Sequence, residues 1–396
     1  DQLPPLAHIW LKAAETTCAF VSAEAERCLE EVEHGLQIAG HHGLESWMYI
    51  LLANGTYGAL LTNNLVLAPE YLDKLRLLPD HLGLCNHIAG WIAVLKGNLH
   101  DASKHAESAL KSVAQQMGGC RFPEALNRFA LAQLHLERRN WEEAVHHLSH
   151  VRHVSDEMGS FLLKYMYWLL HAALALDKGQ EKEGLQYLQR AMALGRARGF
   201  VNFPWWIPSL MARLCAKALE AGIEIDYVRY LVKKRKLMPE PSVQHCSAWP
   251  WPIKVRTLGK FELTVNEEAV NFSRKVQQRP LDLLKAIIAF GGQEVSEALV
   301  TDALWQEAEG DAAHRAFAVT LHRLRKLIGP ENLELKGGRL SLLRQTCYVD
   351  VWAFERWMEK ADSAAQPGDP ELRRRFREKA LSHYGGEFLP DDPSPW

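Results

Sequence analysis

Apolar residues recur with a helical period over most of residues 1–238 of this 396-residue chain, where strand-like alternation is scarce. The pattern breaks at His42-Gly43, Pro79-Asp80, Gly118-Gly119, Gly159-Ser160 and Gly199-Phe200. The last three breaks are about 40 residues apart, a spacing typical of helical repeat proteins. The first 238 residues are therefore predicted to form a helical array.

Each of these repeats contains a second, shorter break. These breaks are Lys96-Gly97-Asn98, Arg138-Arg139-Asn140 and Lys178-Gly179-Gln180. They predict pairs of helices joined by tight turns, because one pair cannot bury its apolar face alone but stacked pairs can. Small residues are expected where paired helices approach closely; they are Ala102, Ala106, Ala144 and Gly184.

This repeat pattern resembles the tetratricopeptide-like arrays of MalT-like bacterial activators, in their longer-repeat variety. The resemblance implies a concave face that holds a peptide, a protein or a small effector. Residues 1–80 follow the pattern less regularly, although 22–40 and 45–61 still predict a helix pair. Most aromatic residues are expected in the core between repeats. Trp205-Trp206 is the exception, because two adjacent tryptophans are not expected to face the same core.

The pattern changes after residue 238. Prolines at 239, 241, 250 and 252 end the helical periodicity, so residues 239–252 are predicted to be a linker without regular structure. Residues 253–265 alternate like strands with a kink at Gly259, then a turn at 266–268 precedes a short strand at 269–272. Helices are predicted to begin at Pro280 and after Ser296, which is expected to be an N-cap.

Residues 311–329 are predicted to form a third, amphipathic helix. Phe317, Leu321, Leu324 and Ile328 make one apolar stripe at helical spacing. The opposite side carries Arg315, Val319, His322, Arg323 and Lys326, with Arg325 on the flank. Such a face is either simply solvated or suited to phosphates and base edges. After the helix, Gly337-Gly338 separates two alternating runs and predicts a hairpin over 333–342.

The order of strands, three helices and a hairpin resembles the winged-helix domain of OmpR/PhoB-type regulators. Residues 258–263, 273–287, 295–305 and 322–329 resemble the DNA-binding domain of SARP-like and AfsR-like activators. The run Tyr384–Pro390 resembles the opening of the bacterial transcriptional activation domain in that family. The resemblance implies a winged-helix domain over 253–350 and the start of a truncated activation domain over 351–396.

The same resemblance implies roles for individual residues. The third helix would lie in the major groove, with Arg323 reading bases beside His322 and Val319. Ala318 stands where the family often has an acidic or polar residue, which leaves the base preference open. The hairpin would touch the flanking minor groove or the DNA backbone, and further phosphate contacts are implied along the helix and before the first helix. The residues implied are Arg315, Thr320, Arg325 and Lys326 on the helix, Lys336 and Arg339 at the hairpin tip, and Ser273, Arg274 and Lys275 before the first helix.

Composition restricts where these functions can lie. The net charge is −2, so any nucleic-acid site must be a local patch. Seven scattered cysteines without a CxxC pair, no apolar run of about 18 residues and no signal peptide predict a cytoplasmic protein without a membrane span. Because the chain begins at Asp1 and ends shortly after a helical segment, it is expected to be a fragment or processed form of a longer protein.

One group of histidines has metal-like spacing. His146, His150 and His153 share one helix face, but no Asp, Glu or Cys completes a ligand set at useful spacing. A solvated face is therefore the expectation, with no metal and no cofactor. The chain also has no GxSxG, no HExxH and no phosphate-binding GxxxxGK[ST] motif, so an enzyme is not expected.

The fold predicted is mainly α, an α-solenoid of tetratricopeptide-like helix pairs followed by a small α+β winged-helix domain. The function predicted is a sequence-specific DNA-binding transcriptional regulator, an activator whose helical array senses an effector or a protein partner. Its partners would be double-stranded DNA and RNA polymerase. The alternative is a protein-interaction scaffold whose array and winged helix dock proteins. The basic side of 311–329 discriminates between them, because protein docking does not need it.

Overall fold

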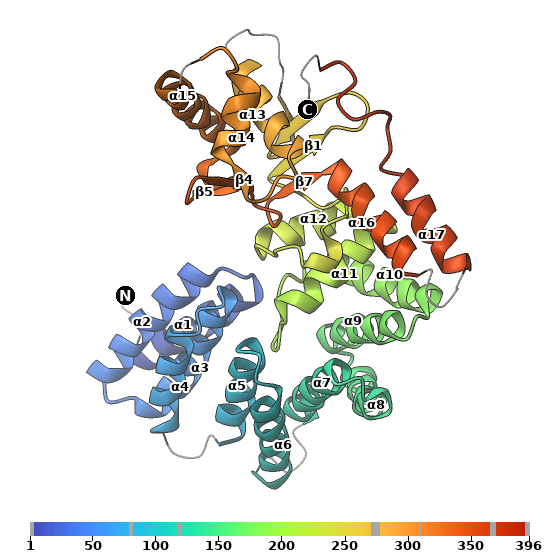
Figure 1. The fold of residues 1–396 in the computed structure, drawn as a ribbon. Coiled ribbons are helices and arrows are strands. Elements are labelled where there is room, and N and C mark those ends of the chain that lie inside the picture. Colours follow the sequence, from blue (N-terminus) through green and yellow to red (C-terminus); the bar gives the residue numbers. More distant parts are fainter. Residues whose placement is uncertain are drawn as a thin grey trace. The chain divides into compact units, whose positions relative to one another are not determined.

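The computed structural model describes residues 4–78, 82–116, 121–270, 278–308, 310–364 and 370–392 (Figure 1). The chain divides into two compact units, Asp1–Leu237 and Met238–Trp396. This division falls one residue from the boundary predicted after residue 238. The predicted fold class is confirmed: helix pairs dominate, and the sheets lie in the C-terminal unit.

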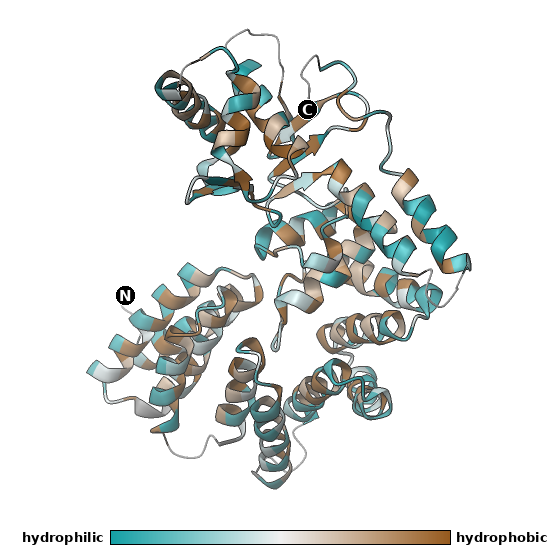
Figure 2. Ribbon diagram, in the orientation of Figure 1, coloured by the Kyte–Doolittle hydropathy of each residue, from teal (hydrophilic) through white to brown (hydrophobic). Residues whose placement is uncertain are grey.

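The described part of the first unit is built from twelve α-helices. In Figure 2, hydrophilic and hydrophobic positions alternate along these helices, as expected for helices that bury one side. The predicted helix at 22–40 begins later, because Ser22–Glu24 belongs to the turn that precedes it. The bounds are α1 Pro5–Val21, α2 Ala25–His41, α3 Glu45–Leu61, α4 Leu67–Arg76, α5 Leu82–Leu95, α6 Leu99–Gln116, α7 Arg121–Glu137, α8 Trp141–Glu157, α9 Phe161–Asp177, α10 Glu181–Arg198, α11 Pro208–Glu220 and α12 Ile225–Lys234.

Three successive helix pairs, α5–α6, α7–α8 and α9–α10, use the same turn. A residue with positive φ stands at its centre: Gly97 at 78°, Arg139 at 59° and Gly179 at 77°. In the α7–α8 turn the Arg139 amide donates to the Leu136 carbonyl and the Asn140 amide to the His135 carbonyl. The other two turns repeat both hydrogen bonds. The predicted tight turns are therefore confirmed as one repeated structure.

Small residues follow each turn and allow the paired helices to approach. Ala102, Ala106 and Ala144 have no exposed surface. A Cβ atom on Gly184 would lie 2.7 Å from the Leu176 side chain, so α9 and α10 pack too closely there for a larger residue. The expectation that these four positions mark close approaches is confirmed.

The expectation for Trp205-Trp206 is wrong. Both tryptophans are buried, with 0% and 1% of their surface exposed. Trp205 has a φ of 63°, in the left-handed region of backbone conformations. Its side chain therefore points in a different direction from that of a residue with negative φ. Its Nε1 donates to the His87 carbonyl at 3.2 Å, while the Trp206 carbonyl accepts from Nε1 of Trp91 at 3.1 Å. The pair is therefore core.

The second unit contains two small sheets and five described α-helices. One sheet has the order β3-β2-β1-β7, in which β1 and β7 run parallel, and the other has the antiparallel order β4-β6-β5. The bounds are β1 Ile253–Arg256, β2 Glu262–Val265, β3 Glu268–Ala269, α13 Gln278–Ala289, β4 Val295–Ser296, α14 Glu297–Leu304, α15 Gly310–Ile328, β5 Leu333–Lys336, β6 Arg339–Leu342, β7 Cys347–Val349, α16 Asp350–Ser363 and α17 Pro370–Leu381.

The predicted order of strands, three helices and a hairpin is confirmed, with differences in detail. The kink at Gly259, where φ is 87°, lies in the reversal between the antiparallel strands β1 and β2. The predicted strand at 269–272 is β3, which begins one residue earlier, and residues 271–277 lie outside the described chain. Ser296 precedes α14, but its side chain makes no capping hydrogen bond.

Segment 239–252, predicted to be a linker without regular structure, packs within the second unit and includes the 3-10 turn Pro241–Val243. Val243, Cys246, Trp249 and Trp251 are all buried. The ring of Trp251 lies 5.8 Å from that of Tyr348, centre to centre, and its Nε1 donates to the Cys246 carbonyl. The prolines end the helical pattern as predicted, but apolar residues between them are large enough to join the core.

The buried carboxylate of Asp350 joins the end of β1 to the start of α16. Its Oδ1 accepts from the amide of Thr257 at 2.8 Å and from the Thr257 hydroxyl at 2.7 Å. Its Oδ2 accepts from the amide of Leu258 at 3.0 Å. The Val351 amide donates to Oδ1 as well. One buried carboxylate therefore satisfies three backbone amides from two distant segments.

No helix in the described ranges is both long and apolar enough to cross a bilayer.

Replacing Asp350 with Asn should destabilise the second unit by about 1–3 kcal/mol, because an amide NH2 would replace one of two acceptor oxygens and meet a backbone donor. Chemical denaturation would measure this loss. Asp362→Asn, at an exposed position of the same helix, should change stability by less than about 0.5 kcal/mol. Equal stability of both variants would contradict the structural role given to the Asp350 carboxylate.

Arg139 occupies the left-handed position that glycine fills in the other two turns. Arg139→Gly should therefore stabilise the chain by about 0.5–1 kcal/mol, because a side chain strains this backbone while glycine does not. Gly179→Ala should have the opposite sign. Urea denaturation of the two variants beside the parent chain tests both signs, and a less stable Arg139→Gly variant would refute the interpretation.

Candidate nucleic-acid interface

Helix α15 is held in place by an apolar stripe that runs its whole length. Phe317 and Leu324 are 1% and 0% exposed, and Leu321 and Ile328 are buried beside them. These side chains pack into one core with residues of α13, α14 and both sheets. The predicted stripe is confirmed, and the helix begins and ends one residue earlier than predicted. Burial of this stripe fixes which side of α15 faces outward.

The outward side of α15 carries three basic residues together with a histidine and a valine. Arg315, Val319, His322, Arg323 and Lys326 are all exposed, Val319 to 52%. We call these five residues the basic face. Within the described residues, their side chains form no salt bridge or hydrogen bond. The charges of Arg315, Arg323 and Lys326 are therefore available to an outside partner.

The structure removes Thr320 from the predicted phosphate contacts. Thr320 is 7% exposed and its hydroxyl donates to the Ala316 carbonyl at 2.7 Å, four residues earlier in the helix. Arg325 is half-buried, and its guanidinium donates to the Leu333 carbonyl at 3.3 Å. Arg325 thus ties α15 to β5. A contact with phosphate would compete with this bond.

The hairpin β5–β6 lies directly after α15 in the chain and is confirmed as predicted. Gly337 and Gly338 form its turn with φ angles of 57° and 72°, which a two-residue hairpin of this hand requires. Lys336 and Arg339 face each other across the turn and are exposed. We call residues 336–339 the hairpin tip. It presents two cations on a short, well-fixed loop.

Arg339 already has an internal partner. Its guanidinium donates to the Glu294 carbonyl at 3.1 Å and lies 3.9 Å from the Glu294 carboxylate. Both side chains are more than half exposed, so this ion pair is weak and can exchange for a phosphate. Lys336 has no salt bridge or side-chain hydrogen bond within the described residues.

Sequence reasoning missed the contacts that join the hairpin tip to the helices. The Glu297 amide at the start of α14 donates to the Gly338 carbonyl at 2.9 Å. The Glu297 carboxylate lies 2.6 Å from Nδ1 of His314 near the start of α15. These residues also line an open pocket of about 780 Å³, together with Asp302 and Trp305. No short-range sequence pattern predicts the contacts among Glu297, His314 and Gly338, because these residues are far apart in the sequence.

The predicted contacts at Ser273, Arg274 and Lys275 lie outside the described residues. The three α8 histidines with metal-like spacing do not form a group of potential metal ligands within the described residues. His146 and His153 are exposed, and His150 and His153 lie 3.1 Å and 3.5 Å from the carboxylates of Glu124 and Glu157 respectively. The expected solvated face therefore holds for His146 and His153, whereas His150 is half-buried.

No family model matches the chain. The chain is 25% identical to the regulatory protein AfsR of Streptomyces griseus over 162 aligned residues. This alignment covers 41% of this chain and 16% of AfsR. The chain thus spans about a sixth of the length of this relative.

Two solved structures align with most of the chain at low sequence identity. The apo form of RapI aligns with a TM-score of 0.38 and 11% identity, over 85% of this chain and 97% of RapI. A Rap protein complexed with competence and sporulation factor aligns with a TM-score of 0.45 and 10% identity, over 96% of this chain and 98% of that one.

Proposed function

We propose that this chain is a sequence-specific DNA-binding transcriptional regulator and that residues 253–350 are its winged-helix domain. The observation that carries the proposal is the basic face of α15, whose cations have no internal partners within the described residues while the opposite side is buried. A helix that served only to fill a core would not need this concentration of unpaired positive charge. The similarity to AfsR, a regulatory protein by name, supports the same class of function.

The dimensions of α15 suit a major groove. Arg315 and Lys326 are eleven residues apart, which is about 16 Å along a helix. The major groove of B-DNA is about 12 Å wide and admits an α-helix. Arg315 and Lys326 can therefore contact phosphates toward the two ends of an inserted helix, and the hairpin tip can contact the adjacent backbone through Lys336 and Arg339.

We assign base readout to Arg323. An arginine can contact both O6 and N7 of guanine, and exposed Val319 offers apolar contact to a thymine methyl group. His322 stands beside Arg323 and can bond to either a base or a phosphate. Arg325 keeps the role of a positioning residue, because its bond to the Leu333 carbonyl holds the reading helix against the hairpin.

The first unit supplies the regulatory part of the proposal. Stacked helix pairs present extended surfaces on which a peptide, a protein or a small effector can bind. We infer that such binding controls the DNA-binding unit and that the regulator acts as an activator through contact with RNA polymerase. The proposal assigns no catalytic step and no cofactor to this chain.

Arg323→Ala should weaken binding to the preferred duplex by about 1–3 kcal/mol, with most of the loss at one base position. Lys326→Ala should weaken binding to all sequences alike. It should also reduce the slope of log affinity against log salt concentration by about one, the value for one lost phosphate contact. The measurement begins with selection of duplexes from a random pool by the full chain. Binding isotherms of the enriched sequence and of point-mutated duplexes, over a range of salt concentrations, then separate the two effects.

Two matched variants serve as controls. Arg374→Ala removes an exposed arginine of α17 that pairs with Glu371, and Thr320→Val removes a hydroxyl that bonds only within its own helix. Both should retain the affinity of the parent chain. If no duplex is enriched and no salt-sensitive affinity appears, DNA binding is refuted. Binding of a protein partner through the basic face would then favour the alternative, a docking scaffold.

A further inference from the structure

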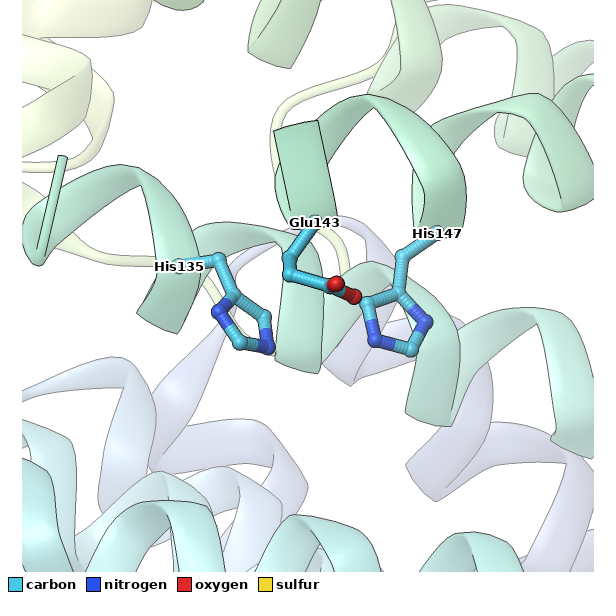
Figure 3. A group of neighbouring side chains, drawn as sticks. All are labelled: His135, Glu143 and His147. Carbon is cyan, nitrogen blue, oxygen red and sulfur yellow. The ribbon is translucent and has the colours of Figure 1, made fainter. Parts of the chain in front are cut away.

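Three potential metal ligands meet at the turn end of the α7–α8 pair. His135 lies in the last turn of α7, while Glu143 and His147 stand one turn apart on α8. One ligand atom from each side chain lies within 4.8 Å of the other two (Figure 3). In the figure, both imidazoles and the carboxylate point into the same space between the two helices. Tertiary packing, and not sequence spacing alone, creates this group.

The helix pair is built so that these side chains must meet. The turn at 138–140 reverses the chain within three residues, and buried Ala144 lets α8 approach α7 closely. Residues at i and i+4 lie on the same face of a helix, so Glu143 and His147 share the side of α8 that His135 faces. The rings of His135 and His147 lie 5.5 Å apart, centre to centre, and are nearly parallel.

The protein leaves all three groups free to bind an ion. Nδ1 of His135 and Nδ1 of His147 are buried and have no hydrogen-bond partner within the described residues, so no such bond fixes the tautomer of either ring. Glu143 is exposed and forms no salt bridge with a described residue.

We propose that His135, Glu143 and His147 form a binding site for a divalent transition metal ion, with zinc as the representative ion. Two imidazoles and one carboxylate are a ligand set that zinc uses, with a fourth position left for water. Calcium and magnesium are disfavoured because they prefer oxygen ligands. A tetrahedral zinc ion holds its ligand atoms about 3.3 Å apart, so the group must contract slightly. The exposed Glu143 side chain can rotate to allow this.

An ion bound here would connect α7 to α8 across their turn. Its binding would stabilise the folded chain by an amount that rises with the logarithm of the free metal concentration above the dissociation constant. The site is part of the helical array and does not depend on the function proposed for α15.

The test uses the full chain without an affinity tag, stripped of metal by a chelator and titrated with zinc in a calorimeter. We expect one ion bound per chain and a rise in the melting temperature of the zinc-loaded protein. Glu143→Gln and His147→Ala should each lower the affinity at least about tenfold, since losing even an outer-shell partner costs 10–100-fold. Cobalt in place of zinc should give the intense visible absorption of a four-coordinate site.

His153→Ala is the matched control, because His153 is an exposed histidine on the same helix outside the group. Its zinc affinity should equal that of the parent chain. Absence of saturable binding at one ion per chain would overturn the proposal, as would equal losses in His153→Ala and His147→Ala, which indicate adventitious surface binding. Unchanged affinity in Glu143→Gln would also overturn it. That variant alters an exposed side chain and is expected to fold, which circular dichroism would check.

Discussion

Burial of the apolar stripe of α15 is the constraint on which the arrangement of the second unit depends. Phe317 and Leu324 are almost completely enclosed, and their core includes residues from both sheets. Rotating α15 about its axis would expose these side chains and bury arginines, at a cost of several kcal/mol. The outward direction of the basic face is therefore a consequence of packing. The hairpin follows α15 closely in the chain and is bonded to it through Arg325, so its position is fixed by the same core.

In the first unit, packing also fixes how the helices are placed, through repeated turns and small residues at the helix contacts. Each of three turns repeats one backbone hydrogen-bond pattern, and small residues follow each turn. Alanine or glycine at the contact allows the two helices to pack closely. The close packing of α7 and α8 brings together His135 and His147, whose rings lie 5.5 Å apart, centre to centre, and are nearly parallel.

Local periodicity was sufficient to predict the parts of the fold that depend on neighbours in sequence. The stripe of α15, the Gly337-Gly338 turn and the three tight turns of the array could all be derived from spacing and glycine positions. Features that depend on tertiary geometry could not. The parallel pairing of β7 with β1 joins segments some 94 residues apart, and the positive φ of Trp205 reverses a side-chain direction that the sequence alone does not indicate. Thr320 shows a finer limit. Around the helix axis, Thr320 lies at the edge of the buried side of α15. Its burial depends on how the neighbouring side chains pack, which the sequence spacing does not show.

The parallel pairing of β1 with β7 has a mechanical consequence. Ile253 pairs with Cys347 and Val255 with Val349, so the first and last strands of this segment lie side by side and run in the same direction. Tension that pulls the chain before Ile253 away from the chain after Val349 would slide the two strands past each other, loading all of their hydrogen bonds together. An antiparallel hairpin pulled from its open end would release its bonds one at a time. The segment between these strands, which includes α15, is thus shielded from tension arriving through the chain on either side.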